Sequence, residues 1–232
     1  FISYDDAYSP PKAVEQTRKL VEGNEVLAVF GALGTPSNTA IQKYLNAKKV
    51  PQLFVATGAT KFGDYKEFPW TMGWQPPYQS EGRIYAKHLL ATKPDAKVAV
   101  MYQNDDFGKD LLKGFKDGLG AKASMIIAED SYEVSEPTID SHILKLKASG
   151  ADTFLSITTP KFAAQAIKKM AEIGWKPLHY LNGVSSSVAS VIVPAGVDNA
   201  KDVITAYYLK DPTDPQWQST QEYKDWLAWM QK

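Results

Sequence analysis

The chain of 232 residues is 44% hydrophobic and 22% charged, a composition typical of a globular protein with one or two domains. Its 26 Lys and Arg residues balance its 26 Asp and Glu residues, so the charge does not indicate a nucleic acid or an anionic membrane as a partner. The absence of cysteine excludes disulfides and thiolate sites. No apolar run approaches the roughly 20 residues of a membrane span.

Apolar runs alternate with amphipathic segments, which predicts parallel sheets with helices on both faces. The first run, Phe1–Tyr4, reads as the end of a strand, so we expect an incomplete chain. Further strands are expected over residues 26–30, 50–55, 97–102, 124–128, 153–157, 179–181 and 203–209. Helices are expected over residues 10–22, 39–48, 79–90, 106–119, 138–148, 162–173, 186–193 and 216–230, with a loop over residues 58–74.

A proline pair interrupts this pattern at Pro76–Pro77, and two adjacent prolines fit neither a helix interior nor a strand within a sheet. The break predicts two doubly wound α/β lobes joined by a hinge, with ligands bound outside the carboxyl ends of the strands. We assign residues 1–76 and 204–232 to the first lobe and residues 77–203 to the second. This assignment assumes that the strand expected over residues 203–209 returns to the first lobe.

The segment Val26–Thr39 combines a buried strand, a glycine-rich turn and the start of a helix. The first N–H groups of such a helix are unpaired and bind carboxylates or phosphates. Gly31 and Gly34 would let a ligand approach the backbone closely. The polar residues at this turn are Thr35, Ser37 and Asn38. An ordinary capped helix is the alternative interpretation, and the absence of a following Gly-Lys-Ser/Thr argues against a nucleoside triphosphate.

Other polar and aromatic residues have ordinary structural interpretations. The aspartates at positions 5–6 and 105–106 lie at strand-to-helix turns and are expected to cap helices, with a ligand or hinge role as the alternative. Capping of the helix that starts after Pro160 is likewise an alternative interpretation of Thr158 and Thr159. The histidines at positions 88, 142 and 179 share no ligand spacing, so no metal site is expected. The Trp-rich segment 216–230 is expected to pack against a sheet. No catalytic residue is assigned, because the chain has no Gly-x-Ser-x-Gly elbow, no cysteine and no full dinucleotide fingerprint.

Several short motifs then occur in a fixed order: Asp5–Pro10, VFGALGT at 29–35, Val50–Pro51, Asn104–Gly108, Gly150–Asp152 and Gly174–Trp175. In this order the chain resembles the periplasmic solute-binding proteins of branched-chain amino-acid-type ABC transporters. The resemblance implies a type I periplasmic-binding-protein fold, a small-molecule ligand, an ABC permease partner and no cofactor. It implies a monomer in the periplasm, or a lipid-anchored extracytoplasmic protein in a Gram-positive bacterium. It also implies that the opening strand and helix and much of the C-terminal part lie outside this chain.

The same motifs place the family's ligand contacts on this sequence. The resemblance implies first-lobe contacts at Leu33, Gly34, Thr35, Ala56, Thr57 and Gly58. It implies second-lobe contacts at Phe107, Thr158, Thr159, Asn182 and Gly183. Two of these positions depart from the family pattern, because Gly58 stands where a threonine is usual and Phe107 where amino-acid binders often have tyrosine. Thr60 is a candidate substitute for that missing threonine.

A third departure concerns the ligand class. Amino-acid binders of this family have an acidic residue after the strand that ends here near Leu181, and residues 180–185 contain none. A buried ammonium without a partner would be costly. The predicted ligand is therefore a small carboxylate without an α-amine, aromatic or otherwise, with a small amide as an alternative. An amino-acid binder and a sensor module of the same fold remain alternatives, and an α/β enzyme is a weaker one.

Overall fold

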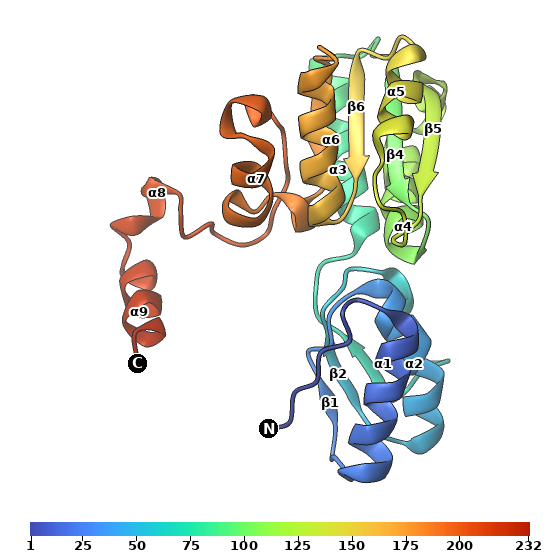
Figure 1. The fold of residues 1–232 in the computed structure, drawn as a ribbon, viewed down its shortest axis with the longest axis vertical. Coiled ribbons are helices and arrows are strands. Elements are labelled where there is room, and N and C mark those ends of the chain that lie inside the picture. Colours follow the sequence, from blue (N-terminus) through green and yellow to red (C-terminus); the bar gives the residue numbers. More distant parts are fainter.

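The computed structural model describes residues 1–232 and contains two α/β lobes, placed one above the other in Figure 1. The first lobe has a parallel three-stranded sheet in the order β1-β2-β3. Its strands are β1 (Val29–Phe30), β2 (Gln52–Val55) and β3 (Thr71–Gly73). Its helices are α1 (Pro10–Arg18), continued by a π-turn over Lys19–Gly23, and α2 (Thr35–Lys48), with a 3-10 turn over Thr60–Gly63.

The second lobe has a parallel four-stranded sheet in the order β5-β4-β6-β7. Its strands are β4 (Val98–Gln103), β5 (Ile126–Tyr132), β6 (Thr153–Ile157) and β7 (Leu178–Leu181). The helices are α3 (Tyr78–Thr92), α4 (Asp106–Leu119), α5 (Asp140–Ala148) and α6 (Pro160–Glu172), with a 3-10 segment over Gly120–Met125. Both sheets are parallel with crossover helices, so the predicted α/β class is confirmed.

The central strand β4 is buried on both faces, as expected for a parallel sheet covered by helices. Val98 and Val100 belong to the core cluster that includes residues of α3 and α4. Ala99 and Met101 belong to the cluster that includes residues of α5 and α6. This alternation explains why a continuous apolar run was recognisable as a strand in the sequence.

Glycines allow α3 and α4 to pack closely. A Cβ on Gly82 would lie 2.3 Å from the carbonyl oxygen of Leu111, and one on Gly114 would lie 2.2 Å from that of Gln79. Any larger residue at these positions would push the two helices apart. This close contact fixes the start of α3, which follows the crossing between the lobes (Figure 1).

Several predicted elements differ from the structure. Phe1–Tyr4 is not a strand, and β3 lies within the segment expected as a loop. Helix α2 begins at Thr35 rather than residue 39, because Pro36 is compatible with a first helical turn. Short helical turns over Gly183–Ser185, Val188–Ile192, α7 (Val193–Ala195) and Val197–Ala200 replace the helix expected over 186–193.

The strand predicted over residues 203–209 is wrong. Only Ile204 pairs, in an isolated parallel bridge with Tyr180 of β7. The chain then continues into α8 (Pro215–Gln218) and α9 (Gln221–Met230), which Figure 1 shows apart from both sheets. Trp226 and Trp229 are exposed there, so the predicted packing of this helix against a sheet is also wrong in this structure. The assignment of residues 204–232 to the first lobe stays a prediction.

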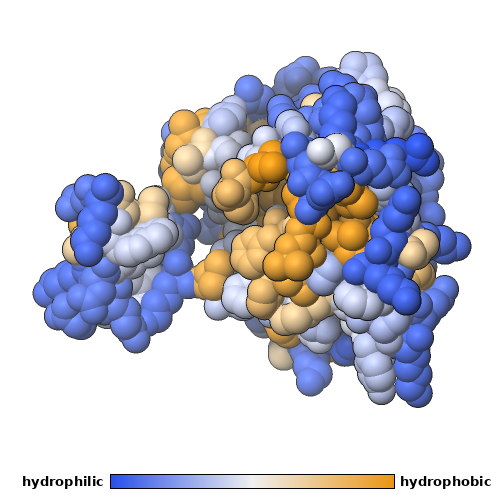
Figure 2. Space-filling view, turned by 90° about the horizontal axis from the view of Figure 1, so that it is seen from below, coloured by the Kyte–Doolittle hydropathy of each residue, from blue (hydrophilic) through white to orange (hydrophobic).

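Strand β1 lies at the edge of the first-lobe sheet. Beside it runs an apolar groove of about 700 Å³, lined mainly by residues 1–6 and 26–33. Figure 2 views the molecule from the first-lobe end and shows hydrophobic residues gathered over the middle of this face. Exposed apolar side chains of the first lobe include Phe1, Leu27, Phe30 and Trp74. No helix in the structure combines the length and the apolar character needed to cross a bilayer.

Candidate functional site

A cavity of about 420 Å³ lies between the lobes, at the carboxyl ends of their strands. From the first lobe and the crossing segment it is lined by Tyr8, Leu33, Gly34, Thr35, Ala56 and Gln75. From the second lobe it is lined by Tyr78, Phe107, Val134, Thr159, Pro160, Lys161, Phe162 and Val184. Four of these residues are aromatic, one is a lysine and none is acidic. The cavity therefore suits an apolar or aromatic ligand with a negative charge.

The turn after β1 forms the first-lobe wall of this cavity. Gly34 has a φ of 94° and is the N-cap of α2, so no side chain caps the helix. Asn38 does not cap it either: its Nδ2 donates to the carbonyl oxygens of Ala32 and Gly34, both at 2.8 Å. Gln52 Nε2 in turn donates to Asn38 Oδ1 at 2.9 Å. These buried hydrogen bonds hold the turn rigidly and leave the start of α2 facing the cavity.

Three hydroxyl groups are arranged in a row at this wall. The Oγ1 atoms of Thr35 and Thr57 lie 2.6 Å apart, and Thr57 Oγ1 lies 3.3 Å from the Tyr78 hydroxyl. Thr57 also accepts a hydrogen bond from the Ala59 N–H at 3.2 Å. Only Thr35 and Tyr78 line the cavity, so the structure places Thr57 as a support for Thr35 rather than in the cavity wall. Burial raises the pKa of Tyr78, which keeps this hydroxyl protonated.

Tyr8 closes one side of the cavity and is held there by an unusual turn. Ala7 and Tyr8 have φ values of 50° and 55°. The carboxylates of Asp5 and Asp6 accept hydrogen bonds from the N–H groups of Ala7 and Tyr8, both at 2.8 Å. The two aspartates therefore stabilise this turn and do not cap α1, contrary to the prediction. The Tyr8 ring lies against Gly34, where an added Cβ would be 2.3 Å from it.

The aromatic wall on the second lobe comes from the starts of α4 and α6. Asp105 caps α4 as predicted, accepting from the N–H groups of Phe107 and Gly108 at 3.0 and 3.2 Å. This cap places Phe107 against Tyr78, with ring centroids 5.0 Å apart. On α6, the Lys161 Nζ lies 4.8 Å from the centroid of the Phe162 ring. The wall thus contains two phenylalanine rings, each about 2% exposed, and one cation.

The turn after β6 contributes Thr159 but not Thr158. Thr159 N–H donates to the Tyr132 hydroxyl at 3.0 Å, and its side chain makes no cap bond to α6, contrary to the capping alternative. Thr158 is fully buried, and its N–H donates to Asn182 Oδ1 at 2.8 Å. Thr158 and Asn182 therefore join the ends of β6 and β7 and do not line the cavity.

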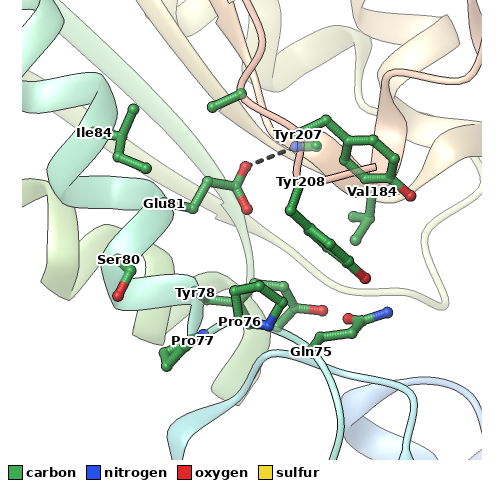
Figure 3. Close-up of a pocket in the computed structure, with 12 residues that line it drawn as sticks. Gln75, Pro76, Pro77, Tyr78, Ser80, Glu81, Ile84, Val184, Tyr207 and Tyr208 are labelled. Carbon is green, nitrogen blue, oxygen red and sulfur yellow. Dashed lines mark hydrogen bonds between the residues drawn. The ribbon is translucent and has the colours of Figure 1, made fainter. Parts of the chain in front are cut away.

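Gly183 and Gly58 lie at the hinge rather than in the cavity. The Gly58 carbonyl accepts from the Tyr78 N–H at 2.8 Å. The Gly183 N–H donates to Glu81 Oε1 at 2.7 Å, the dashed line in Figure 3. The Tyr85 hydroxyl lies 2.8 Å from the same oxygen. Burial raises the pKa of Glu81.

Glu81 borders a second, smaller cavity of about 130 Å³, drawn in Figure 3. This hinge cavity shares Gln75, Tyr78 and Val184 with the interlobe cavity, but Glu81 lines only the hinge cavity. The Glu81 carboxylate is thus separated from the interlobe cavity by the residues that the two cavities share.

The structure brings six predicted contacts into one cavity wall: Leu33, Gly34, Thr35, Ala56, Phe107 and Thr159. Thr57, Gly58, Thr158, Asn182 and Gly183 support that wall or the hinge instead. The predictions missed eight lining residues: Tyr8, Gln75, Tyr78, Val134, Pro160, Lys161, Phe162 and Val184. Signals for some were present, since Gln75 and Tyr78 flank the proline pair and Lys161 closely follows Thr159. No group of three or more His, Asp or Glu side chains is placed to bind a metal.

Comparison with known proteins identifies the family. A family model described as periplasmic binding protein matches residues 1–232. The chain belongs to the periplasmic binding protein family. Its curated relatives include the Leu/Ile/Val-binding protein homolog 7 of Brucella abortus, 23% identical over 215 residues that cover 90% of the chain and 53% of that protein. The leucine-specific-binding protein of Salmonella typhimurium is 24% identical over 65% of the chain and 40% of its own length. The chain thus spans about half the length of these curated relatives.

Solved structures of this periplasmic binding protein family share the fold. A substrate-binding periplasmic protein from Ralstonia solanacearum matches with a TM-score of 0.83 and 21% identity, covering 97% of this chain and 63% of its own. An ABC-transporter solute-binding protein from Rhodopseudomonas palustris, in complex with 4-hydroxybenzoate, matches with a TM-score of 0.84 and 18% identity, covering 100% and 61%. The predicted type I fold is confirmed.

Proposed function

We propose that this protein is an extracytoplasmic solute-binding protein that captures a small carboxylate without an α-amine, most suitably an aromatic acid, between its two lobes for ABC import. One observation carries this proposal: the interlobe cavity has four aromatic rings, one lysine and no carboxylate in its wall. Membership of the periplasmic binding protein family supports ligand binding rather than catalysis.

The first-lobe wall supplies the chemistry for the ligand carboxylate. The start of α2 has no side-chain cap, so the helix dipole and the N–H of Thr35 are available to an anion, whereas Pro36 has no N–H to offer. The Thr35 hydroxyl lies at the same place and is held by Thr57. Either hydroxyl of this pair can donate, and Thr35 can donate to the ligand once Thr57 turns its single proton from the Tyr78 hydroxyl to Thr35. The ligand carboxylate is then bound by hydrogen bonds to a negatively charged acceptor, which are stronger than neutral ones.

The second-lobe wall supplies the selectivity. Phe107 and Phe162 are apolar rings without a hydroxyl, so they favour stacking with an aromatic ring over hydrogen bonding. An α-ammonium in this cavity would have no carboxylate among the lining residues and would lose its hydration. The structural likeness to a protein bound to 4-hydroxybenzoate agrees with this ligand class, although at 18% identity it supports the fold alone.

An amino acid is the second candidate ligand, and two observations favour it. The curated relatives are Leu/Ile/Val- and leucine-binding proteins. In addition, Glu81 lies in the hinge cavity next to the interlobe cavity. For Glu81 to bind an ammonium, the ligand would have to pass Tyr78 and Val184. A Glu81→Gln variant separates the candidates, since it should weaken phenylalanine binding only if the carboxylate contacts the ammonium.

A thermal-shift screen of the purified protein tests the proposal. The screen compares aromatic acids, short-chain acids and amino acids under the same conditions. A ligand at 100 times its Kd should add about 2.7 kcal/mol to the free energy of unfolding. Stabilisation by aromatic acids supports the proposal, and stabilisation by amino acids alone contradicts it. The same proposal includes a periplasmic location and an ABC permease as partner. Genes for a permease and an ATPase next to the gene of this protein would support a role in transport over a role in sensing.

A further inference from the structure

Lys161 is the one charged residue in the wall of the interlobe cavity. Its Nζ lies over the Phe162 ring and makes no ion pair or hydrogen bond within the chain. Lys61, at the lobe junction, differs in pairing with Asp106 at 3.0 Å. The cavity therefore contains one positive charge without a negative partner.

The position of Lys161 in its helix is electrostatically unfavourable. It is the second residue of α6, which runs from Pro160 to Glu172. A cation in the first turn of a helix lies next to the positive end of the helix dipole, where an anion is preferred. Lys169 in the last turn of the same helix has the favourable position and pairs with Glu172 at 3.0 Å. Lys161 is exposed, so water hydrates its ammonium group in the free protein, and an anion bound in the cavity would offset the unfavourable interaction with the helix dipole.

We infer that Lys161 binds the negative charge of the ligand from the second lobe, and this inference rests on the proposed function. The first lobe offers hydrogen bonds at Thr35 and the start of α2, and the second lobe offers a full positive charge. An anionic ligand would then contact both walls and stabilise the closed arrangement of the lobes. A neutral ligand of the same shape would retain the aromatic contacts and the hydrogen bonds but not the ion pair. Lys161 is thus a specificity-determining residue for the charge of the ligand.

The test compares benzoate with benzamide, which differ little in shape and differ in charge. Calorimetric titration of both ligands is carried out on the wild-type protein, Lys161→Met and Lys161→Arg. The matched control is Lys168→Met, which removes an exposed lysine from the same helix outside the cavity wall. We expect Lys161→Met to weaken benzoate binding about 10- to 100-fold and leave benzamide binding within about twofold. Lys161→Arg and Lys168→Met should retain most of the benzoate affinity.

Each outcome decides a separate point. If Lys161→Met binds benzoate as tightly as the wild-type protein, the role of Lys161 is refuted while the proposed function stands. If the variant weakens benzoate and benzamide equally, Lys161 acts through packing and the inference is also refuted. If the wild-type protein binds phenylalanine and no aromatic acid, the proposed function fails and the inference fails with it. Circular dichroism and a thermal midpoint for each variant show whether the fold is intact.

Discussion

Replacing Thr35 by valine should weaken ligand binding much more than it weakens the fold. The change keeps the side-chain shape and removes the hydroxyl that lies 2.6 Å from Thr57 Oγ1. Thr57 retains the Tyr78 hydroxyl at 3.3 Å and the Ala59 N–H at 3.2 Å, so it is not left unpaired. The free energy of unfolding should therefore fall by only about 1 kcal/mol. A lost hydrogen bond to the ligand carboxylate should cost about 1.5–3 kcal/mol, or roughly 10- to 150-fold in Kd.

Calorimetric titration with benzoate measures the affinity, and urea denaturation measures the stability. Thr35→Ser is the matched control, because it keeps the hydroxyl and should stay within a few-fold of the wild-type affinity. Thr57→Val should have an intermediate effect, since it removes the support of Thr35 but no ligand contact. The reasoning is refuted if Thr35→Val binds benzoate with unchanged affinity, or if Thr35→Ser loses as much affinity as Thr35→Val.

Three further substitutions test the packing and the titratable groups. Gly34→Ala places a methyl group 2.3 Å from the Tyr8 ring at a φ of 94°, and should lower the free energy of unfolding by roughly 1–3 kcal/mol; an unchanged urea midpoint would contradict this. Burial lowers the pKa of His179 from 6.5 to about 4, so this histidine is protonated more readily in the unfolded chain. The free energy of unfolding should therefore fall by about 3 kcal/mol as the pH decreases from 6.5 toward 4. His179→Phe should remove this loss, and a parallel loss in denaturation curves of the variant would count against it. Because burial raises the pKa of Glu81, its contribution to the free energy of unfolding is greatest below pH 4.5 and is lost as the pH rises through the pKa of the folded state. Glu81→Gln should therefore gain stability relative to the wild-type protein at neutral pH. Identical pH profiles of stability for the two proteins would refute this.

Local patterns predicted the regular elements of the second lobe well. The bounds of α4 and β6 coincide with the predicted ranges 106–119 and 153–157, because each has a strong apolar period and a clear start or stop signal. Strand β3 was missed because its three residues form a strand only through pairing with β2, which is not encoded locally. The apolar run at 203–209 was misread because Tyr207 and Tyr208 line the hinge cavity instead of joining a sheet.

The site was predictable where it follows directly from a strand end. Gly34 and Thr35 fall in the cavity wall because parallel strands end at the same edge of the sheet. Contacts between distant segments were not predictable in this way. Glu81 and Gly183 are 102 positions apart, and no periodicity links them. The position of Tyr8 depends on a left-handed turn that Asp5 and Asp6 stabilise. The sequence motif Asp5–Pro10 indicated a turn at this place but not its left-handed conformation.

The central claim is that the interlobe cavity accepts a carboxylate and rejects an α-ammonium. The most direct measurement is a calorimetric comparison of 3-phenylpropanoate with phenylalanine, which differ only in the α-amine. Because the cavity wall contains no carboxylate, the account predicts that 3-phenylpropanoate binds at least about tenfold more tightly, since an unpartnered buried charge costs several kcal/mol. Tighter binding of phenylalanine than of 3-phenylpropanoate would contradict the account.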